Sequence, residues 1–89
     1  MEERIKAGDV VKHFKRELIA EKDNGPNFAY LYEVLSTNAL DTATENRVVV
    51  YRALYGNHAI FVRPYEDFMG MVDRHKYPEV SQVYRFEKV

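Results

Sequence analysis

The chain has 89 residues, with 13 Lys and Arg against 14 Asp and Glu, a net charge of −1 and no cysteine. A chain of this length forms one domain, here over residues 1–89, and it buries only roughly 60 to 65% of the surface of its unfolded form. Little interior is therefore left for a deep active site. The lack of cysteine excludes disulfide scaffolds and Cys-based zinc sites, and the near-zero charge provides no overall attraction to a polyanion.

The composition is that of a folded domain. Hydrophobic residues make up 46% of the chain and charged residues 30%, which is typical of a globular rather than a disordered protein. No apolar segment has the length of a membrane span or the position of a signal-peptide core. We therefore expect a cytoplasmic protein that makes no contact with a membrane.

Branched and aromatic residues predict five strands along the chain. In chain order these cover residues 9–14, 28–37, 47–55, 59–63 and 82–88. The polar segment LDTATEN forms the turn between the second and third strands. Gly56 and Asn57 form the centre of a two-residue hairpin turn after the third, because glycine adopts the positive φ that such turns require.

Two further segments are not strands. Residues 16–22 form either a short helix or an irregular excursion, and the local signals leave both open. Pro64 suits the first turn of a helix, with Glu66 and Asp67 at its favourable N-terminal end, so we expect a short helix near residues 64–70. The fold class is then mainly all-β, either a small SH3-like antiparallel barrel or a strongly bent sheet with this one helix.

The alternation of side chains along a strand predicts which residues share a face. We expect the second and third strands to pair so that Glu33 faces Arg52, Leu31 faces Leu54 and Leu35 faces Val50. One face, the natural core face, then carries Tyr30, Tyr32, Val34, Val49, Tyr51, Ala53 and Tyr55. With the turn at Gly56 and Asn57, Ile60 and Val62 join this face. A bulge or an odd-length turn would exchange some of these positions.

The opposite face is mixed, because apolar residues there surround three charged ones. Its predicted members are Leu31, Leu35, Val50, Leu54, Phe61, Glu33, Arg52 and Arg63. In one interpretation the helix or the C-terminal segment covers this face, and Arg52 forms a cross-strand ion pair with Glu33. In the other, Arg52, Arg63, Glu33 and Phe61 are the candidate ligand-binding residues of an exposed surface, since arginine and aromatic side chains are favoured at binding sites and a guanidinium suits carboxylate or phosphate.

The sequence contains no catalytic constellation, and we predict no catalytic residue, metal or cofactor. The glycines do not form a phosphate-binding loop, and the serines lack the context of a strained nucleophile. Three histidines have no metal-ligand spacing, and each is expected to be exposed: His13, His58 and His75. Glu66 and Asp67 are expected to stabilise the start of the helix.

We therefore expect a non-enzymatic binding module for a protein or a small anionic ligand. One alternative is a small enzyme or enzyme accessory domain acting on a nucleotide or metabolite, which a pocket holding an acid together with Arg52 would favour. A second is binding of single-stranded nucleic acid by stacking on the aromatic residues. It is not favoured, because the basic residues Lys12, Lys15 and Arg16 are followed closely by Glu17 and Glu21.

Six segments carry a family resemblance: GDVVKHFKRE, YLYEVL, VVYRALYG, VRPYEDFM, VDRHKYP and YRFEK. In order and spacing they resemble the small bacterial family catalogued as domain of unknown function 1653 (DUF1653), from about Gly8 to Lys88. The resemblance implies a compact, mostly β domain similar to a small barrel, in a cytoplasmic bacterial or phage-associated setting, and the family has no assigned activity. Members often have a His-Thr-Glu-Thr turn where this chain has Asp41-Thr42-Ala43-Thr44, which weakens any catalytic role for that turn.

Overall fold

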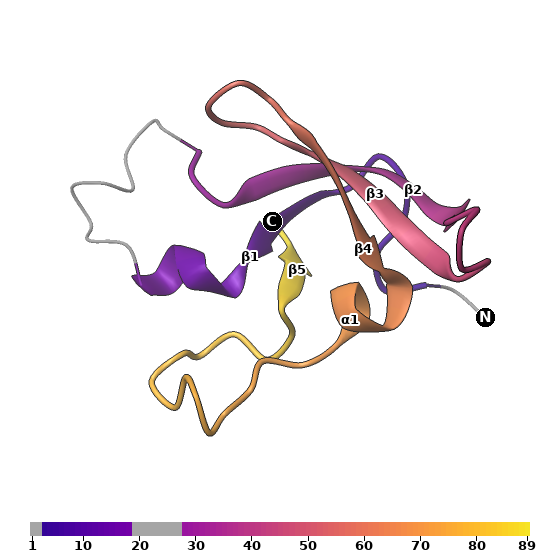
Figure 1. Cartoon of the computed structure of the whole chain (residues 1–89). Coiled ribbons are helices and arrows are strands. Elements are labelled where there is room, and N and C mark those ends of the chain that lie inside the picture. The colour runs from indigo at the N-terminus through magenta and orange to yellow at the C-terminus, as the bar shows by residue number, and fades with distance from the viewer. Residues whose placement is uncertain (1–2, 19–27) are drawn as a thin grey trace.

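The computed structural model describes residues 3–18 and 28–89. Its elements are β1 (Val10–His13), the 3₁₀ helix η1 (Phe14–Leu18), β2 (Leu31–Leu40), β3 (Arg47–Ala53), β4 (Ile60–Pro64), α1 (Tyr65–Met69) and β5 (Phe86–Lys88). The strands form one five-stranded antiparallel sheet in the order β4-β3-β2-β1-β5 (Figure 1). The two edge strands, β4 and β5, are not paired with each other. The predicted fold class is therefore confirmed in the form of a bent, open sheet with a short helix.

The element boundaries follow from local backbone conformation. β2 begins later than predicted because Phe28 and Tyr30 have φ angles of 56° and 63°, and a residue in this left-handed region cannot continue a strand. Residues 16–22 were predicted to form either a short helix or an irregular excursion. Residues 16–18 belong to the 3₁₀ helix η1, and residues 19–22 lie outside the described residues. None of the helices in the described ranges is long and apolar enough to cross a membrane.

The pairing of β2 with β3 confirms the predicted register over its first part. Glu33 lies opposite Arg52, and the N–H of Leu54 donates a 3.0 Å hydrogen bond to the carbonyl of Leu31. The register then shifts, so that Val50 faces Ser36 and the predicted pair of Leu35 with Val50 is wrong. A β-bulge of this kind inserts an extra residue into one strand of the pair.

The pairing of β3 with β4 differs from the prediction by one residue. Tyr51 lies opposite Phe61, and Val49 lies opposite Arg63. The connection is not a two-residue turn at Gly56 and Asn57 but spans residues 54–59, and His58 within it has a φ of 57°. A one-residue change moves every side chain of a strand to the other face.

The predicted faces of β4 are consequently wrong. Phe61 and Arg63 share the inner face with Tyr51 instead of the face of Arg52. Ile60 and Val62, expected in the core, lie on the outer face and are 61% and 66% exposed.

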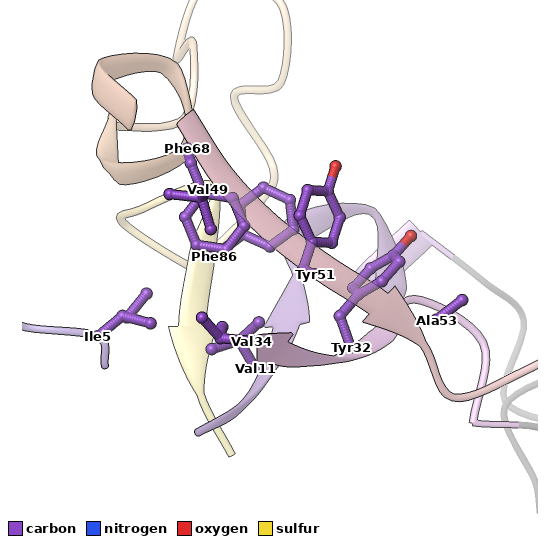
Figure 2. Close-up of a cluster of buried hydrophobic side chains, with 9 residues drawn as sticks. All are labelled: Ile5, Val11, Tyr32, Val34, Val49, Tyr51, Ala53, Phe68 and Phe86. Atoms are coloured by element: carbon purple, nitrogen blue, oxygen red, sulfur yellow. The ribbon is translucent and has the colours of Figure 1, made fainter. Parts of the chain in front are cut away.

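The core lies on the inner, concave face of the sheet (Figure 2). Its buried members are Ile5, Val11, Tyr32, Val34, Val49, Tyr51, Ala53, Phe68 and Phe86. The five of these that lie on β2 and β3 were all predicted there. Phe68 of α1 and Phe86 of β5 stack with ring centres 4.0 Å apart, which joins the helix and the last strand over this face. Burial of each large side chain stabilises the fold by about 1.5 to 3 kcal/mol.

Candidate functional site

The four predicted ligand-binding residues do not lie together. Glu33 and Arg52 are on the outer face of the sheet, whereas Phe61 and Arg63 are on the inner face. The sheet thus separates them into a cross-strand pair and a second group that belongs to a larger cluster of polar and aromatic side chains.

The outer pair is an exposed ion pair. Nη2 of Arg52 donates a 2.6 Å hydrogen bond to Oε1 of Glu33, with the two side chains 44% and 33% exposed. The predicted ion pair is therefore present. The helix and the C-terminal segment do not cover this outer face, because α1 and β5 pack against the inner face through Phe68 and Phe86. An exposed pair of this kind contributes about 0 to 1 kcal/mol.

Arg63 is the centre of the inner group. Its Nε donates a 3.3 Å hydrogen bond to the hydroxyl of Tyr51, and its Nη1 donates a 3.0 Å bond to Oδ2 of Asp67. The guanidinium carbon lies 5.4 Å from the centre of the Phe86 ring. Burial lowers the pKa of Arg63, but the hydrogen bond with Tyr51 and the charge of Asp67 outweigh it and raise the pKa. Nη2 forms no hydrogen bond with any described residue, so part of the donor fork is available to a ligand.

Asp67 holds a second arginine on its other carboxylate oxygen. Nη1 of Arg85 donates a 2.7 Å hydrogen bond to Oδ1 of Asp67 and a 2.8 Å bond to its carbonyl. Asp67 lies in the first turn of α1, the position predicted for it, and the helix has no side-chain capping bond at its N-terminus. One carboxylate between two guanidiniums leaves the group with a net positive charge.

His13 lies beside this group and is buried, so the prediction of an exposed histidine is wrong. Its ring centre is 4.9 Å from that of Phe86, and its Nδ1 accepts a 3.1 Å hydrogen bond from the Lys15 N–H. Burial, and then the charges of Arg63, Lys15 and Arg85, lower the pKa of His13 to about 4. The ring is therefore neutral at neutral pH, with its proton on Nε2.

Tyrosine hydroxyls and an exposed phenylalanine complete the inner surface. The hydroxyls of Tyr32 and Tyr55 are 2.8 Å apart, and burial raises the pKa of Tyr32. Figure 2 shows the hydroxyls of Tyr32 and Tyr51 pointing the same way, away from the aliphatic part of the core. Phe61 is 41% exposed, with its ring centre 5.7 Å from that of Tyr51.

We call this inner surface the arginine–aromatic cluster. Its members are His13, Tyr30, Tyr32, Tyr51, Tyr55, Phe61, Arg63, Asp67 and Arg85. Tyr30, at its rim, has the left-handed φ of 63°. Such a conformation is strained for a bulky residue, and backbone strain of this kind concentrates at ligand sites.

A separate surface depression of about 510 Å³ lies at the other end of β4. It is lined by Asn46, Arg47, Pro64, Tyr65 and Glu66. Its polar groups engage one another: the Arg47 guanidinium lies 3.8 Å from the centre of the Tyr65 ring, and both residues donate hydrogen bonds to the Glu3 carboxylate. These hydrogen bonds hold Glu3 in place and lower its pKa, chiefly through the bond from Tyr65.

The depression does not include Arg52, so it lacks the combination of residues that would favour the enzyme interpretation. Within residues 3–18 and 28–89, no group of three or more His, Asp or Glu side chains is placed to hold a metal ion.

The fold and the cluster define a small β domain, in which an open bent sheet presents arginines and aromatic rings on its concave face. A family model described as "Protein of unknown function (DUF1653)" matches residues 9–88, and the chain belongs to this family. The identification made from the sequence segments is thus confirmed. No curated protein and no solved structure shows a match to the chain.

Proposed function

We propose that the chain is a non-enzymatic binding module whose arginine–aromatic cluster binds a carboxylate or phosphate group of its ligand. The observation that carries the proposal is the setting of Arg63. Tyr51 and Asp67 hold its guanidinium in place, its side chain is 33% exposed, and Nη2 has no partner among the described residues. A positioned, partly desolvated guanidinium binds carboxylate and phosphate in a defined geometry.

The local charge supports an anionic ligand. Arg63, Arg85 and Lys15 all act on buried His13, while Asp67 supplies the opposing charge of the cluster. This positive excess occurs in a chain whose net charge is −1. An anion is therefore attracted to this part of the surface rather than to the molecule as a whole.

The exposed ring of Phe61 supports a ligand with a flat or apolar part next to its anionic group. Phe61 and Arg63 are two residues apart on β4 and share its inner face, where both side chains contact Tyr51, so the ring and the guanidinium are neighbours on this surface. Tyr30 and Tyr55 add half-buried rings packed against the core. Arg52 and Glu33 then act as a structural pair on the other face.

Thermal denaturation with phenyl phosphate, inorganic phosphate and phenol tests this proposal. We expect phenyl phosphate to raise the melting temperature most, because it supplies both the anion and the ring. Arg63→Gln should abolish the increase. Arg63→Lys should reduce it, because lysine keeps the charge but lacks the paired N–H donors of the guanidinium. Arg52→Gln, on the other face, should leave it unchanged. Equal stabilisation of the wild type and Arg63→Gln, or no stabilisation by either anion, would overturn the proposal.

A further inference from the structure

The outer edge of β4 carries backbone groups that face away from the rest of the sheet. The N–H of Ala53 donates a 2.9 Å hydrogen bond to the carbonyl of Ala59, so the groups of Ala59 face β3. Backbone groups alternate along an antiparallel strand, and those of Phe61 therefore also face β3. The N–H and C=O groups of Ile60 and Val62 point to the open edge, which Figure 1 shows between the 54–59 connection and α1.

This edge has little of the protection that edge strands usually have. The backbone groups of Ile60 and Val62 that face it form no hydrogen bond with the described residues. Their side chains are aliphatic and 61% and 66% exposed. Proteins commonly protect such edges with lysine, proline or a bulge. Here Pro64 ends the strand, and the two preceding outward positions remain available for pairing.

The two faces of β4 specify the chemistry of a strand that would pair there. Residues of the added strand on the inner face would lie beside Phe61 and Arg63, where the positive charge of Arg63 and Arg85 favours an acidic side chain. Residues on the outer face would lie beside Ile60 and Val62, where an aliphatic side chain is favoured. The complementary segment therefore has an acidic residue between two aliphatic ones.

We propose that the ligand of the arginine–aromatic cluster is an extended segment of a partner protein, which adds to β4 as a further strand and presents a carboxylate to Arg63. This inference rests on the proposed function and identifies the ligand of the same site. Pairing of main chains provides affinity in such complexes, and alternate side chains provide specificity. Pro64 limits the pairing to the short stretch from Ile60 to Val62.

The probe is the peptide acetyl-Thr-Val-Glu-Val-Thr-amide, studied by amide hydrogen exchange and titration calorimetry. Its matched control is the same peptide methylated on the backbone nitrogens of both valines, which keeps the charge but cannot donate to β4. We expect the parent peptide to protect the Ile60 and Val62 amides from exchange. Methylation, or replacement of the peptide Glu by Gln, should weaken binding by about tenfold or more, equivalent to about 1.4 kcal/mol.

A protein variant provides a second, independent measurement. Val62→Pro removes the outward N–H, which has no partner among the described residues, and Val62→Thr is its matched control. Peptide binding should be lost in Val62→Pro and retained in Val62→Thr. If Val62→Pro does not fold, the comparison of the parent and methylated peptides on the wild-type protein still shows whether backbone pairing contributes to binding.

The outcomes separate this inference from the proposed function. Equal binding of the methylated and parent peptides, with phenyl phosphate still acting through Arg63, overturns the inference and leaves the function intact. Failure of both the peptide and phenyl phosphate overturns both. Protection of the Ile60 and Val62 amides that rises with protein concentration, without peptide, would assign the edge to a second copy of the chain and also overturn the inference.

Discussion

Arg52 and Glu33 face each other directly across β3 and β2, and their 2.6 Å hydrogen bond joins the two strands on the outer face. Because both side chains are more than 30% exposed, water screens the pair. We predict that Arg52→Gln and Glu33→Gln each lower the free energy of unfolding by less than about 1 kcal/mol, with a coupling energy in the double mutant of about 0 to 1 kcal/mol. Urea denaturation measures both. A loss above about 3 kcal/mol would mean that the pair is buried in solution.

The shared carboxylate of Asp67 is predicted to matter more. Asp67→Asn removes the charge between Arg63 and Arg85 and leaves one neutral acceptor oxygen in place of the two anionic ones that each held a guanidinium. We expect a loss of about 1 to 2 kcal/mol in the free energy of unfolding, since the group is only partly exposed. The matched control is Glu66→Gln, a change at the exposed neighbouring position. Equal effects of the two substitutions would contradict a special role for Asp67.

Acid should destabilise the protein through His13. Its pKa is lowered from 6.5 to about 4 by burial and by the charges of Arg63, Lys15 and Arg85, so the unfolded chain binds the proton more readily than the folded one. The stability from the neutral ring is present above pH 6.5 and is lost as the pH falls towards about 4. At about 1.4 kcal/mol per pH unit, the full loss is on the order of 3 kcal/mol.

Denaturation at a series of pH values checks this prediction. His13→Gln should remove the dependence between pH 6.5 and about 4, whereas His75→Gln, at an exposed position, should leave it in place. An unchanged pH dependence in His13→Gln would show that the histidine is not buried as described.

Glu17 is predicted to anchor the C-terminal segment to the 3₁₀ helix. Its carboxylate accepts hydrogen bonds from the N–H and hydroxyl of Ser81 and from the N–H of Gln82, at 2.8 to 2.9 Å. These bonds, chiefly that from the Ser81 N–H, lower the pKa of Glu17, so its contribution is present above pH 4.5 and is lost on further acidification. Glu17→Ala, which removes both acceptor oxygens, should cost roughly 1 to 3 kcal/mol at neutral pH and abolish protection of the Ser81 amide from hydrogen exchange. Retained protection would contradict the anchor.

Side-chain alternation predicted much of β2 and β3, including the inner face and the pair of Glu33 with Arg52. It failed at β4, because the register there depends on the connection. The left-handed conformation of His58 lengthens that connection to residues 54–59, and nothing in the local sequence separates this from a two-residue turn. A one-residue error in register was enough to place Phe61 and Val62 on the wrong faces of the sheet.

The candidate site was only partly predictable for the same physical reason. Phe61 and Arg63 were identified as binding residues, but their face depends on the register. Arg85 reaches Asp67 from a distant part of the chain, and no local pattern reports such a contact. The burial of His13 does have a signal, since alternation along β1 places it on the same face as fully buried Val11.

The most direct test of the ligand site follows the Nε–Hε signals of the arginines by NMR while phenyl phosphate is added to isotope-labelled protein. We expect the Arg63 signal to shift in a saturable way, because Nη2 of its guanidinium has no partner among the described residues and the exposed ring of Phe61 lies on the same face of β4. The Arg52 signal should not move. A shift at Arg52 with Arg63 unchanged, or no saturable shift at either, would contradict the assignment of the site to the inner face.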